Sequence, residues 1–187
     1  MRFLMRKWWR EEMMQSIGTR LSWHATRLLW GRGLGTYPRS SMLERPDMLS
    51  NPHRIHFAQN VLVRKGARLE AVMHEGTLGE IHFGTGTIAQ FYLHVGAARG
   101  VTIGKVCTIA GRVYISDHDH DMPTQEGRLI VSPVSIGDGC WLGEGCAILK
   151  GVTLGDGCVV GANAVVTHSA PSGSILAGVP ARIIKTR

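Results

Sequence analysis

The fold is decided by residues 136–166, whose sequence is IGDGCWLGEGCAILKGVTLGDGCVVGANAVV. An aliphatic residue returns at every sixth position of this stretch, at Ile136, Leu142, Ile148, Leu154, Val160 and Val166. A period of six matches neither the 3.6 residues of a helical turn nor the two-residue alternation of a flat strand. It is typical of a solenoid in which each unit forms one short strand and a turn, and three units complete a coil. We therefore predict an all-β solenoid.

This period continues toward the N-terminus, with interruptions, to about residue 55. About two extra residues fall near Ala97–Gly100, and a long insertion follows Ile115. We expect residues 117–133 to project from the solenoid wall as a loop, and long loops in compact folds are usually functional. Two domains are predicted: a helical segment over residues 1–50 and the solenoid over residues 51–187.

Residues 1–50 do not follow the six-residue period. Apolar residues recur at every fourth position from Met5 to Leu21, which predicts short amphipathic helices. The segment holds four of the five tryptophans, and its basic residues outnumber its acidic ones. We expect it to cap the open end of the solenoid. The sequence leaves open a second role, in which its basic, tryptophan-rich side lies on an anionic membrane surface.

Composition bears on location and partners. The chain has 187 residues, a formal net charge of +7 and 24 glycines, which suit tight solenoid corners. All four cysteines fall at the same inward position of the six-residue unit, so we expect buried, reduced thiols in a reducing compartment. No apolar run is long enough to span a membrane and no signal peptide is recognisable, which predicts a cytoplasmic protein, at most peripheral at the inner face of the membrane. No nucleic-acid recognition motif accompanies the positive charge.

Three further segments accompany the repeat: Asp117–His120 (DHDH), residues 139–143 (GCWLG) and residues 177–182 (AGVPAR). Together with the repeat they resemble the hexapeptide-repeat acyltransferases, above all the sugar O-acetyltransferases of the galactoside and maltose type and their relatives in surface-polysaccharide assembly. The resemblance implies a left-handed parallel β-helix and a homotrimer with active sites between subunits. It also implies acetyl-CoA as co-substrate and no metal.

The histidines of the loop suit the chemistry of acetyl transfer. A hydroxyl is a poor nucleophile until its proton is being removed, and imidazole, with an unperturbed pKa of about 6.5, takes such a proton at neutral pH. By resemblance, His118 is the general base and the reaction needs no covalent intermediate. We expect Asp117 or Asp119 to orient His118 or to hold its conjugate acid, and His120 is a second candidate for the base. Gln90 matches a position that contacts the acceptor sugar in the resembling enzymes, so Gln90, Asp117 and His120 are the predicted substrate-binding residues.

The predicted coenzyme site comes from later units of the repeat. Negative charge develops on the thioester oxygen in the transition state, so a backbone N–H donor is needed nearby. In the resembling enzymes this donor follows a Trp-Ile-Gly-like segment, which here gives Gly143 and the backbone amide of Glu144. The resemblance further implies that pantetheine runs past Ala162 and Thr167. Arg182 and Lys185 are the basic residues expected to meet the phosphates of the coenzyme.

The predicted function is therefore acetyl-CoA-dependent O-acetylation of a sugar, a nucleotide sugar or a lipid-linked glycan precursor. N-acetylation of an amino sugar, or acetylation of a xenobiotic hydroxyl, would use the same base. A zinc carbonic anhydrase on the same solenoid would need three convergent histidine ligands, and the loop supplies only two. A non-catalytic scaffold would leave the histidine loop without a role.

Overall fold

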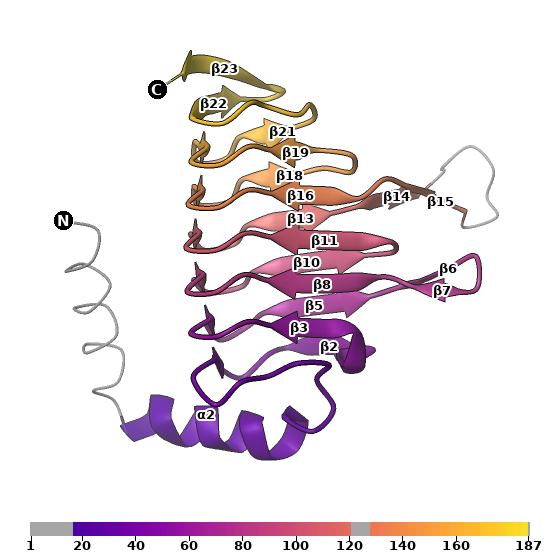
Figure 1. Cartoon of the computed structure of the whole chain (residues 1–187), viewed down its shortest axis with the longest axis vertical. Coiled ribbons are helices and arrows are strands. Elements are labelled where there is room, and N and C mark those ends of the chain that lie inside the picture. The colour runs from indigo at the N-terminus through magenta and orange to yellow at the C-terminus, as the bar shows by residue number, and fades with distance from the viewer. Residues whose placement is uncertain (1–16, 121–127, 187) are drawn as a thin grey trace.

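Short strands, most of them paired in parallel with strands of neighbouring coils and joined by turns, form the body of the described part of the protein (Figure 1). The computed structural model describes residues 17–120 and 128–186, with side chains from residue 21 onward.

Three sheets run along the molecule. Sheet A contains β3 (Ile55–Phe57), β8 (Glu80–Phe83), β11 (Gly100–Ile103), β16 (Val134–Ile136) and β19 (Thr153–Leu154). Sheet B contains β1 (Met42–Leu43), β4 (Leu62–Val63), β9 (Ile88–Ala89), β12 (Thr108–Ile109), β17 (Trp141–Leu142), β20 (Val159–Val160), β22 (Ser174–Gly178) and β23 (Ala181–Thr186). Sheet C contains β2 (Met48–Ser50), β5 (Arg68–Ala71), β10 (His94–Ala97), β13 (Tyr114–Ser116), β18 (Ala147–Ile148) and β21 (Val165–Val166).

The chain visits the three sheets in a fixed order, from B to C to A and back to B. It therefore winds as a three-sided coil, and we name its corners B–C, C–A and A–B after the sheets they join. Two antiparallel ribbons leave the C–A corner: β6 (Met73–His74) with β7 (Thr77–Leu78), and β14 (His118–His120) with β15 (Leu129–Val131). The prediction of an all-β fold of stacked parallel strands is confirmed, and the loop predicted after Ile115 begins as the β14–β15 ribbon. A single-turn 3-10 helix, Pro52–Arg54, precedes β3.

The core is a stack of like side chains inside the coil. On sheet A, Ile103 pairs with Ile136, and the rings of Phe57 and Phe83 stack with centroids 5.0 Å apart. All four cysteines are buried and free, as predicted. Parallel pairing brings the same inward position of every coil into register, and burying these apolar side chains stabilises the stack.

The coils differ in length, which explains where the sequence period is clear and where it is weak. In the C-terminal half Trp141 pairs with Val159, an offset of eighteen residues, or three six-residue units. In the preceding half Ile88 pairs with Thr108, an offset of twenty. Two extra residues per coil preserve the stacking in space and break the period in the sequence.

Helix α2 (Ile17–Trp30) lies across the N-terminal end of the coil (Figure 1). Thr26 is buried and its hydroxyl accepts the backbone N–H of Arg45 at 3.1 Å. The guanidinium of Arg27 donates to the carbonyls of Pro38 and Ser41, each at 2.8 Å. One face of α2 therefore packs on the first coil. Among the described residues, no helix combines the length and the apolar character that crossing a membrane requires.

The boundary predicted at residues 50 and 51 lies too late in the chain. Met42 pairs in parallel with Leu62, and Met48 pairs with Arg68, so the first coil already includes residues assigned to the helical segment. The reason is that this coil also has twenty residues and therefore lacks the six-residue signal. The part of the predicted helical segment before Ile17 lies outside the described residues.

Candidate active site

The base of the β14–β15 ribbon is held at the C–A corner by main-chain hydrogen bonds. The N–H of Asp117 donates to the carbonyl of Gly96 at 3.2 Å, and the N–H of Ser132 donates to the carbonyl of Asp117 at 2.8 Å. Ser116 supports the turn into the ribbon, because its hydroxyl donates to the carbonyl of His118 at 2.7 Å. The start of the histidine loop is therefore fixed to the coil wall.

Asp117 anchors this corner with a fully buried carboxylate. Its Oδ1 accepts the N–H of Ala98, and its Oδ2 accepts the N–H groups of Arg99 and Gly100, all at 2.7 Å. Burial opposes ionisation, but the hydrogen bonds from His118 and from these three amides prevail and lower the pKa of Asp117. The carboxylate is therefore charged at neutral pH. The two extra residues noticed near Ala97–Gly100 form this anchor, a role that the sequence did not reveal.

His118 lies against the wall with its ring oriented by Asp117. Nδ1 of His118 is 2.9 Å from Oδ1 of Asp117, and the side chain of His118 is 15% exposed. A carboxylate at Nδ1 selects the tautomer with the proton on Nδ1, which leaves Nε2 as a lone-pair acceptor. The ring lies over Gly96: a Cβ added at Gly96 would be 3.1 Å from Cε1 and 3.8 Å from Nε2 of His118. This arrangement leaves Nε2 able to accept a proton.

His120 lacks a comparable setting. It ends β14 and is exposed, whereas Asp119 between the two histidines forms an ion pair with Lys150 from a later coil. That ion pair ties the ribbon to the coil that carries β18. Of the two histidines, only His118 is close to a buried carboxylate in the part of the chain that the structure describes.

A second group of predicted residues lies together at the B–C corner. Gly143 and Glu144 follow β17, Ala162 follows β20 and Gln90 follows β9. The carboxylate of Glu144 accepts the backbone N–H of Gly111 at 3.1 Å and pairs with Arg112 at 3.2 Å, both from the preceding coil. Ala162 occupies the matching place on the next coil and has no side-chain acceptor. The backbone N–H of Glu144 therefore has no acceptor among the described residues, and it is available to a ligand.

The two groups lie at opposite edges of sheet C. Arg112, next to Glu144, precedes β13, whereas Asp117 follows it. Five residues of extended chain span about 16 Å. One copy of the chain therefore does not bring Glu144 and His118 together, nor Gln90 and His118.

The remaining predicted coenzyme residues lie near the C-terminal end. Thr167 follows β21 at the C–A corner, on the same corner as His118 but on a later coil. Arg182 and Lys185 are exposed on β23, which pairs antiparallel with β22. Thr167, Arg182 and Lys185 therefore lie toward the C-terminal end of the coil, and the structure does not bring them together in one site.

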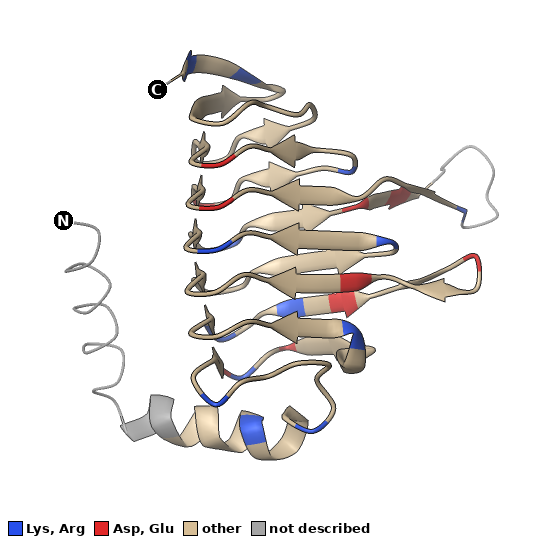
Figure 2. Ribbon diagram, viewed as in Figure 1, with Lys and Arg blue, Asp and Glu red and all other residues tan. Residues whose placement is uncertain are grey.

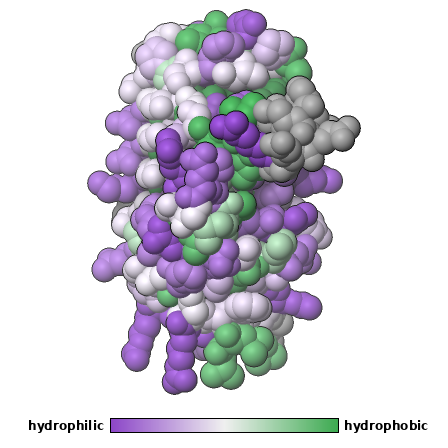
Figure 3. Space-filling view, turned by 90° about the vertical axis from the view of Figure 1, so that its right-hand side faces the viewer, coloured by the Kyte–Doolittle hydropathy of each residue, from purple (hydrophilic) through white to green (hydrophobic). Residues whose placement is uncertain are grey.

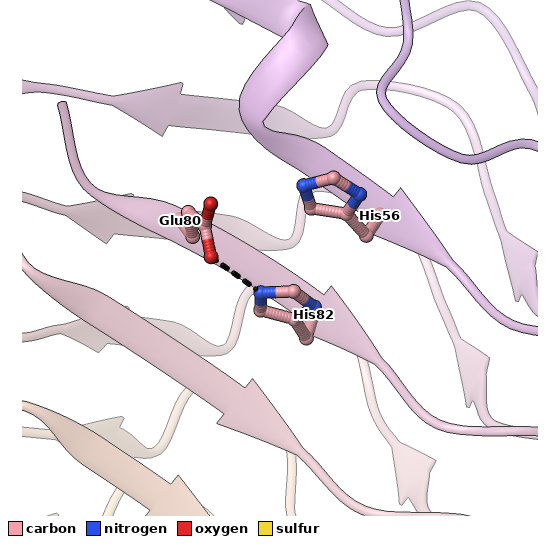
Figure 4. Close-up of side chains that lie close together, drawn as sticks. All are labelled: His56, Glu80 and His82. Carbon is pink, nitrogen blue, oxygen red and sulfur yellow. Dashed lines mark hydrogen bonds and ion pairs between the residues drawn. The ribbon is translucent and has the colours of Figure 1, made fainter.

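One cluster in the described part of the chain has the residue types of a metal site. His56, Glu80 and His82 lie on sheet A with candidate ligand atoms within 4.8 Å of one another (Figure 4). Arg54 already balances the charge of Glu80 at 2.9 Å, and the two rings stack 4.6 Å apart with an interplanar angle of 9°. Stacked rings hold their nitrogen lone pairs in parallel planes, which does not suit a shared cation. We interpret this cluster as a structural ion-pair network, and it does not include His118.

Comparison with known proteins bears on the family of the chain. Residues 133–168 match the family model described as the hexapeptide repeat of succinyl-transferase. The chain is 35% identical over 161 residues to the putative lipopolysaccharide biosynthesis O-acetyl transferase WbbJ of Escherichia coli K12, covering 80% of this chain and 80% of that protein. It is 33% identical over 126 residues to the galactoside O-acetyltransferase of the same organism, covering 66% of this chain and 62% of that enzyme, which is less than two thirds of its length.

Solved structures share the fold. A mutant of AntD, an N-acyltransferase from Bacillus cereus in complex with dTDP and coenzyme A, superposes with a TM-score of 0.76 at 20% identity, covering 89% of this chain and 91% of that one. At this identity the likeness concerns the fold alone. The identity to WbbJ over 80% of both chains goes further: this protein belongs to the hexapeptide-repeat acyltransferase family, and it is an acyltransferase.

Proposed function

We propose that the protein transfers the acetyl group of acetyl-CoA to a hydroxyl of a sugar or glycan precursor. The observation that carries this proposal is the Asp117–His118 pair, in which a buried, charged carboxylate orients an imidazole and leaves its Nε2 free. WbbJ and the galactoside enzyme, both named O-acetyltransferases, support a sugar acceptor.

In the proposed mechanism Nε2 of His118 takes the proton of the acceptor hydroxyl as its oxygen attacks the thioester carbon. The tetrahedral intermediate then collapses and the carbon–sulfur bond breaks. The imidazolium returns the proton to the leaving thiolate, so no acetyl group is attached to the enzyme. Asp117 stabilises the imidazolium, because its negative charge lies 2.9 Å from Nδ1.

The backbone N–H of Glu144 is the proposed donor to the developing oxyanion. Because Glu144 and Gln90 lie at the opposite edge of sheet C from His118, they must come from a neighbouring copy. This geometry supports a homotrimer with one active site at each interface, on a left-handed parallel β-helix. Gly143 and Ala162 then line the pantetheine path, with Thr167, Arg182 and Lys185 toward the phosphates.

The test is a thiol-release assay with acetyl-CoA and a panel of methyl glycosides, nucleotide sugars and matching amino sugars. We expect transfer to a hydroxyl sugar, and we expect His118→Ala to lower kcat by about 10²–10⁴-fold with little change in the KM for acetyl-CoA. His120→Ala serves as the matched control and should change kcat far less. Transfer only to the amino sugars would replace O-acetylation by N-acetylation, and an unchanged kcat in His118→Ala would contradict the mechanism.

We further propose that α2 combines the two roles considered for the N-terminal segment. Its inner face caps the first coil, and its outer face carries leucines that suit the surface of an anionic membrane. Leu28 is 83% exposed and Leu29 is 74% exposed, and apolar side chains gather at this end of the molecule (Figure 3). The exposed basic residues Arg32 and Arg39 follow the helix, which supports binding to acidic lipids.

A further inference from the structure

The outer face of sheet C beside His118 carries a second polar cluster. The ring of His118 lies over Gly96 on β10. Gly96 pairs in register with Ser116 on β13 and, on its other side, with Glu70 on β5. Glu70 is therefore one strand away from the glycine that the ring covers. Neighbouring strands are about 4.8 Å apart. Since Gly96 has no side chain, nothing on β10 stands between His118 and Glu70.

Glu70 is held rigidly by its neighbours. Its Oε1 is 2.9 Å from a guanidinium nitrogen of Arg68 and 3.1 Å from Nε2 of His94, and its side chain is 19% exposed. Burial lowers the pKa of His94, and the charges of Arg68 and His118 lower it further against the opposing effect of Glu70. His94 is therefore neutral at neutral pH, and its Nε2 lies 3.1 Å from Oε1 of the carboxylate.

The second oxygen of the carboxylate is left open. Oε2 of Glu70 accepts no hydrogen bond from the described residues, although the side chain is mostly buried. A charged acceptor fixed in this way binds a donor such as a hydroxyl strongly. Tyr114, whose ring meets His94 edge to face at 5.0 Å, adds a partly exposed aromatic surface on the same side of the sheet.

We propose that Glu70 binds the acceptor: its Oε2 accepts a hydrogen bond from the hydroxyl next to the one that His118 deprotonates. The acceptor is accordingly a compound with two neighbouring hydroxyls, as on a sugar ring. Arg68 and His94 act as positioning residues, because they hold Oε1 and thereby aim Oε2. This inference rests on the proposed function. In it, Glu70 and His118 belong to the same copy of the chain, and both contact the acceptor.

A matched control exists on sheet A. Glu80 likewise faces an arginine and a histidine, with Arg54 at 2.9 Å and His82 at 3.0 Å. Figure 2 shows an acidic position on each of β5 and β8, and Figure 4 shows Glu80 beside His82. It lies on a different sheet from the surface beneath the His118 ring. Glu70→Gln and Glu80→Gln each remove one negative charge that faces an arginine and a histidine, and only the first removes the proposed acceptor contact.

The experiment measures steady-state kinetics of the full chain with the best methyl glycoside of the panel and with its monodeoxy analogues. In Glu70→Gln the amide oxygen stays with Arg68 and His94, and an NH2 group replaces Oε2. We expect the KM for the glycoside to rise about 10- to 100-fold while the KM for acetyl-CoA is unchanged. Glu80→Gln should leave both constants at the wild-type values.

The deoxy analogue that lacks the neighbouring hydroxyl gives a second readout that needs no change in the protein. The wild type should discriminate against it by a similar factor, and Glu70→Gln should lose that discrimination. If Glu70→Gln keeps the wild-type KM for the glycoside, or still rejects the deoxy analogue as strongly, the inference is overturned while the proposed function stands. If the wild type acetylates no sugar at all, the proposed function fails and this inference fails with it.

Discussion

Replacing Asp117 by asparagine tests whether the buried carboxylate sets the state of His118. The carboxylate receives four N–H donors, two on each oxygen: those of Ala98 and His118 on Oδ1, and those of Arg99 and Gly100 on Oδ2. Asparagine has one acceptor oxygen and one NH2 group. If its oxygen keeps Arg99 and Gly100, the NH2 group faces the other two donors.

Two consequences follow, one for the reaction and one for stability. When Nδ1 of His118 faces an NH2 group, it must act as a hydrogen-bond acceptor, so the ring proton moves to Nε2. A protonated Nε2 can no longer take the proton of the sugar hydroxyl. We expect kcat to fall on the order of 10²–10⁴-fold. The N–H of Ala98 is left buried without an acceptor, so the free energy of unfolding should decrease by about 1–3 kcal/mol.

Thiol release at saturating acetyl-CoA and acceptor measures the first effect, and denaturant unfolding measures the second. Asp119→Asn is the matched control, because Asp119 belongs to the same loop but pairs with Lys150. Adding Asp117→Asn to His118→Ala should cost little further activity, since both changes act on the same base. Wild-type kcat in Asp117→Asn, or equal effects of the two asparagine variants, would refute the proposed orientation.

The stability effect should depend on pH. The pKa of Asp117 is lowered in the folded protein by its hydrogen bonds, despite burial. The carboxylate therefore contributes stability above its unfolded pKa, and this contribution is lost as the pH falls through the folded value. The difference in unfolding free energy between the wild type and Asp117→Asn should shrink as the solution is acidified. A constant difference across the acid range would contradict the charged state of Asp117.

Three further predictions concern packing and the N-terminal helix. Gly96→Ala places a Cβ 3.1 Å from the ring of His118, the proposed base, so kcat should fall about 10- to 100-fold while the KM for acetyl-CoA is unchanged; steady-state kinetics check this. Burial raises the pKa of the Cys146 thiol to about 12, which marks its surroundings as apolar. Cys146→Ser buries a hydroxyl there, so it should lower the unfolding free energy by about 1–3 kcal/mol. Cys158→Ser should be nearly neutral in the same denaturation experiment, since its thiol already donates to a carbonyl at 3.2 Å. Changing Leu28 and Leu29 to glutamine should abolish co-sedimentation with anionic vesicles and leave activity intact, and equal binding of the variant and the wild type would remove the membrane proposal.

The fold could be predicted best where each coil has three six-residue units. From Ile136 to Val166 every inward residue falls on the period, and the parallel pairing of Trp141 with Val159 follows from it. Between Met42 and Leu62 the same stacking uses twenty residues, so the period is lost although the structure is the same. The sequence therefore placed the start of the coil too late, because extra residues at a corner change the spacing without changing the side that each strand occupies.

The candidate site could be predicted only in part, because its members are brought together by strand register. His118 and its neighbour Asp117 are adjacent in the chain, and a histidine loop interrupting a repeat is a visible signal. Gly96 and Glu70 carry no such signal. They reach His118 only because β5, β10 and β13 pair in parallel with these residues at matching positions. Gln90 shows the reverse: the resemblance assigns it to the same site as His118, but within one copy it lies at the other edge of sheet C.

The position of a carboxylate relative to His118, rather than the types of its neighbouring residues, distinguishes the proposed acceptor site at Glu70 from the structural cluster at Glu80. Glu70 and Glu80 each contact one arginine and one histidine at about the same distances, but Glu70 does so through Oε1 alone, whereas Glu80 uses Oε1 for Arg54 and Oε2 for His82. They differ in what lies beside them: Glu70 adjoins Gly96, which has no side chain and is covered by the ring of His118. A carboxylate that stabilises a sheet surface in one place can bind an acceptor in the other. The paired glutamine variants therefore compare two carboxylates with similar partners, of which only Glu70 adjoins the glycine that the His118 ring covers.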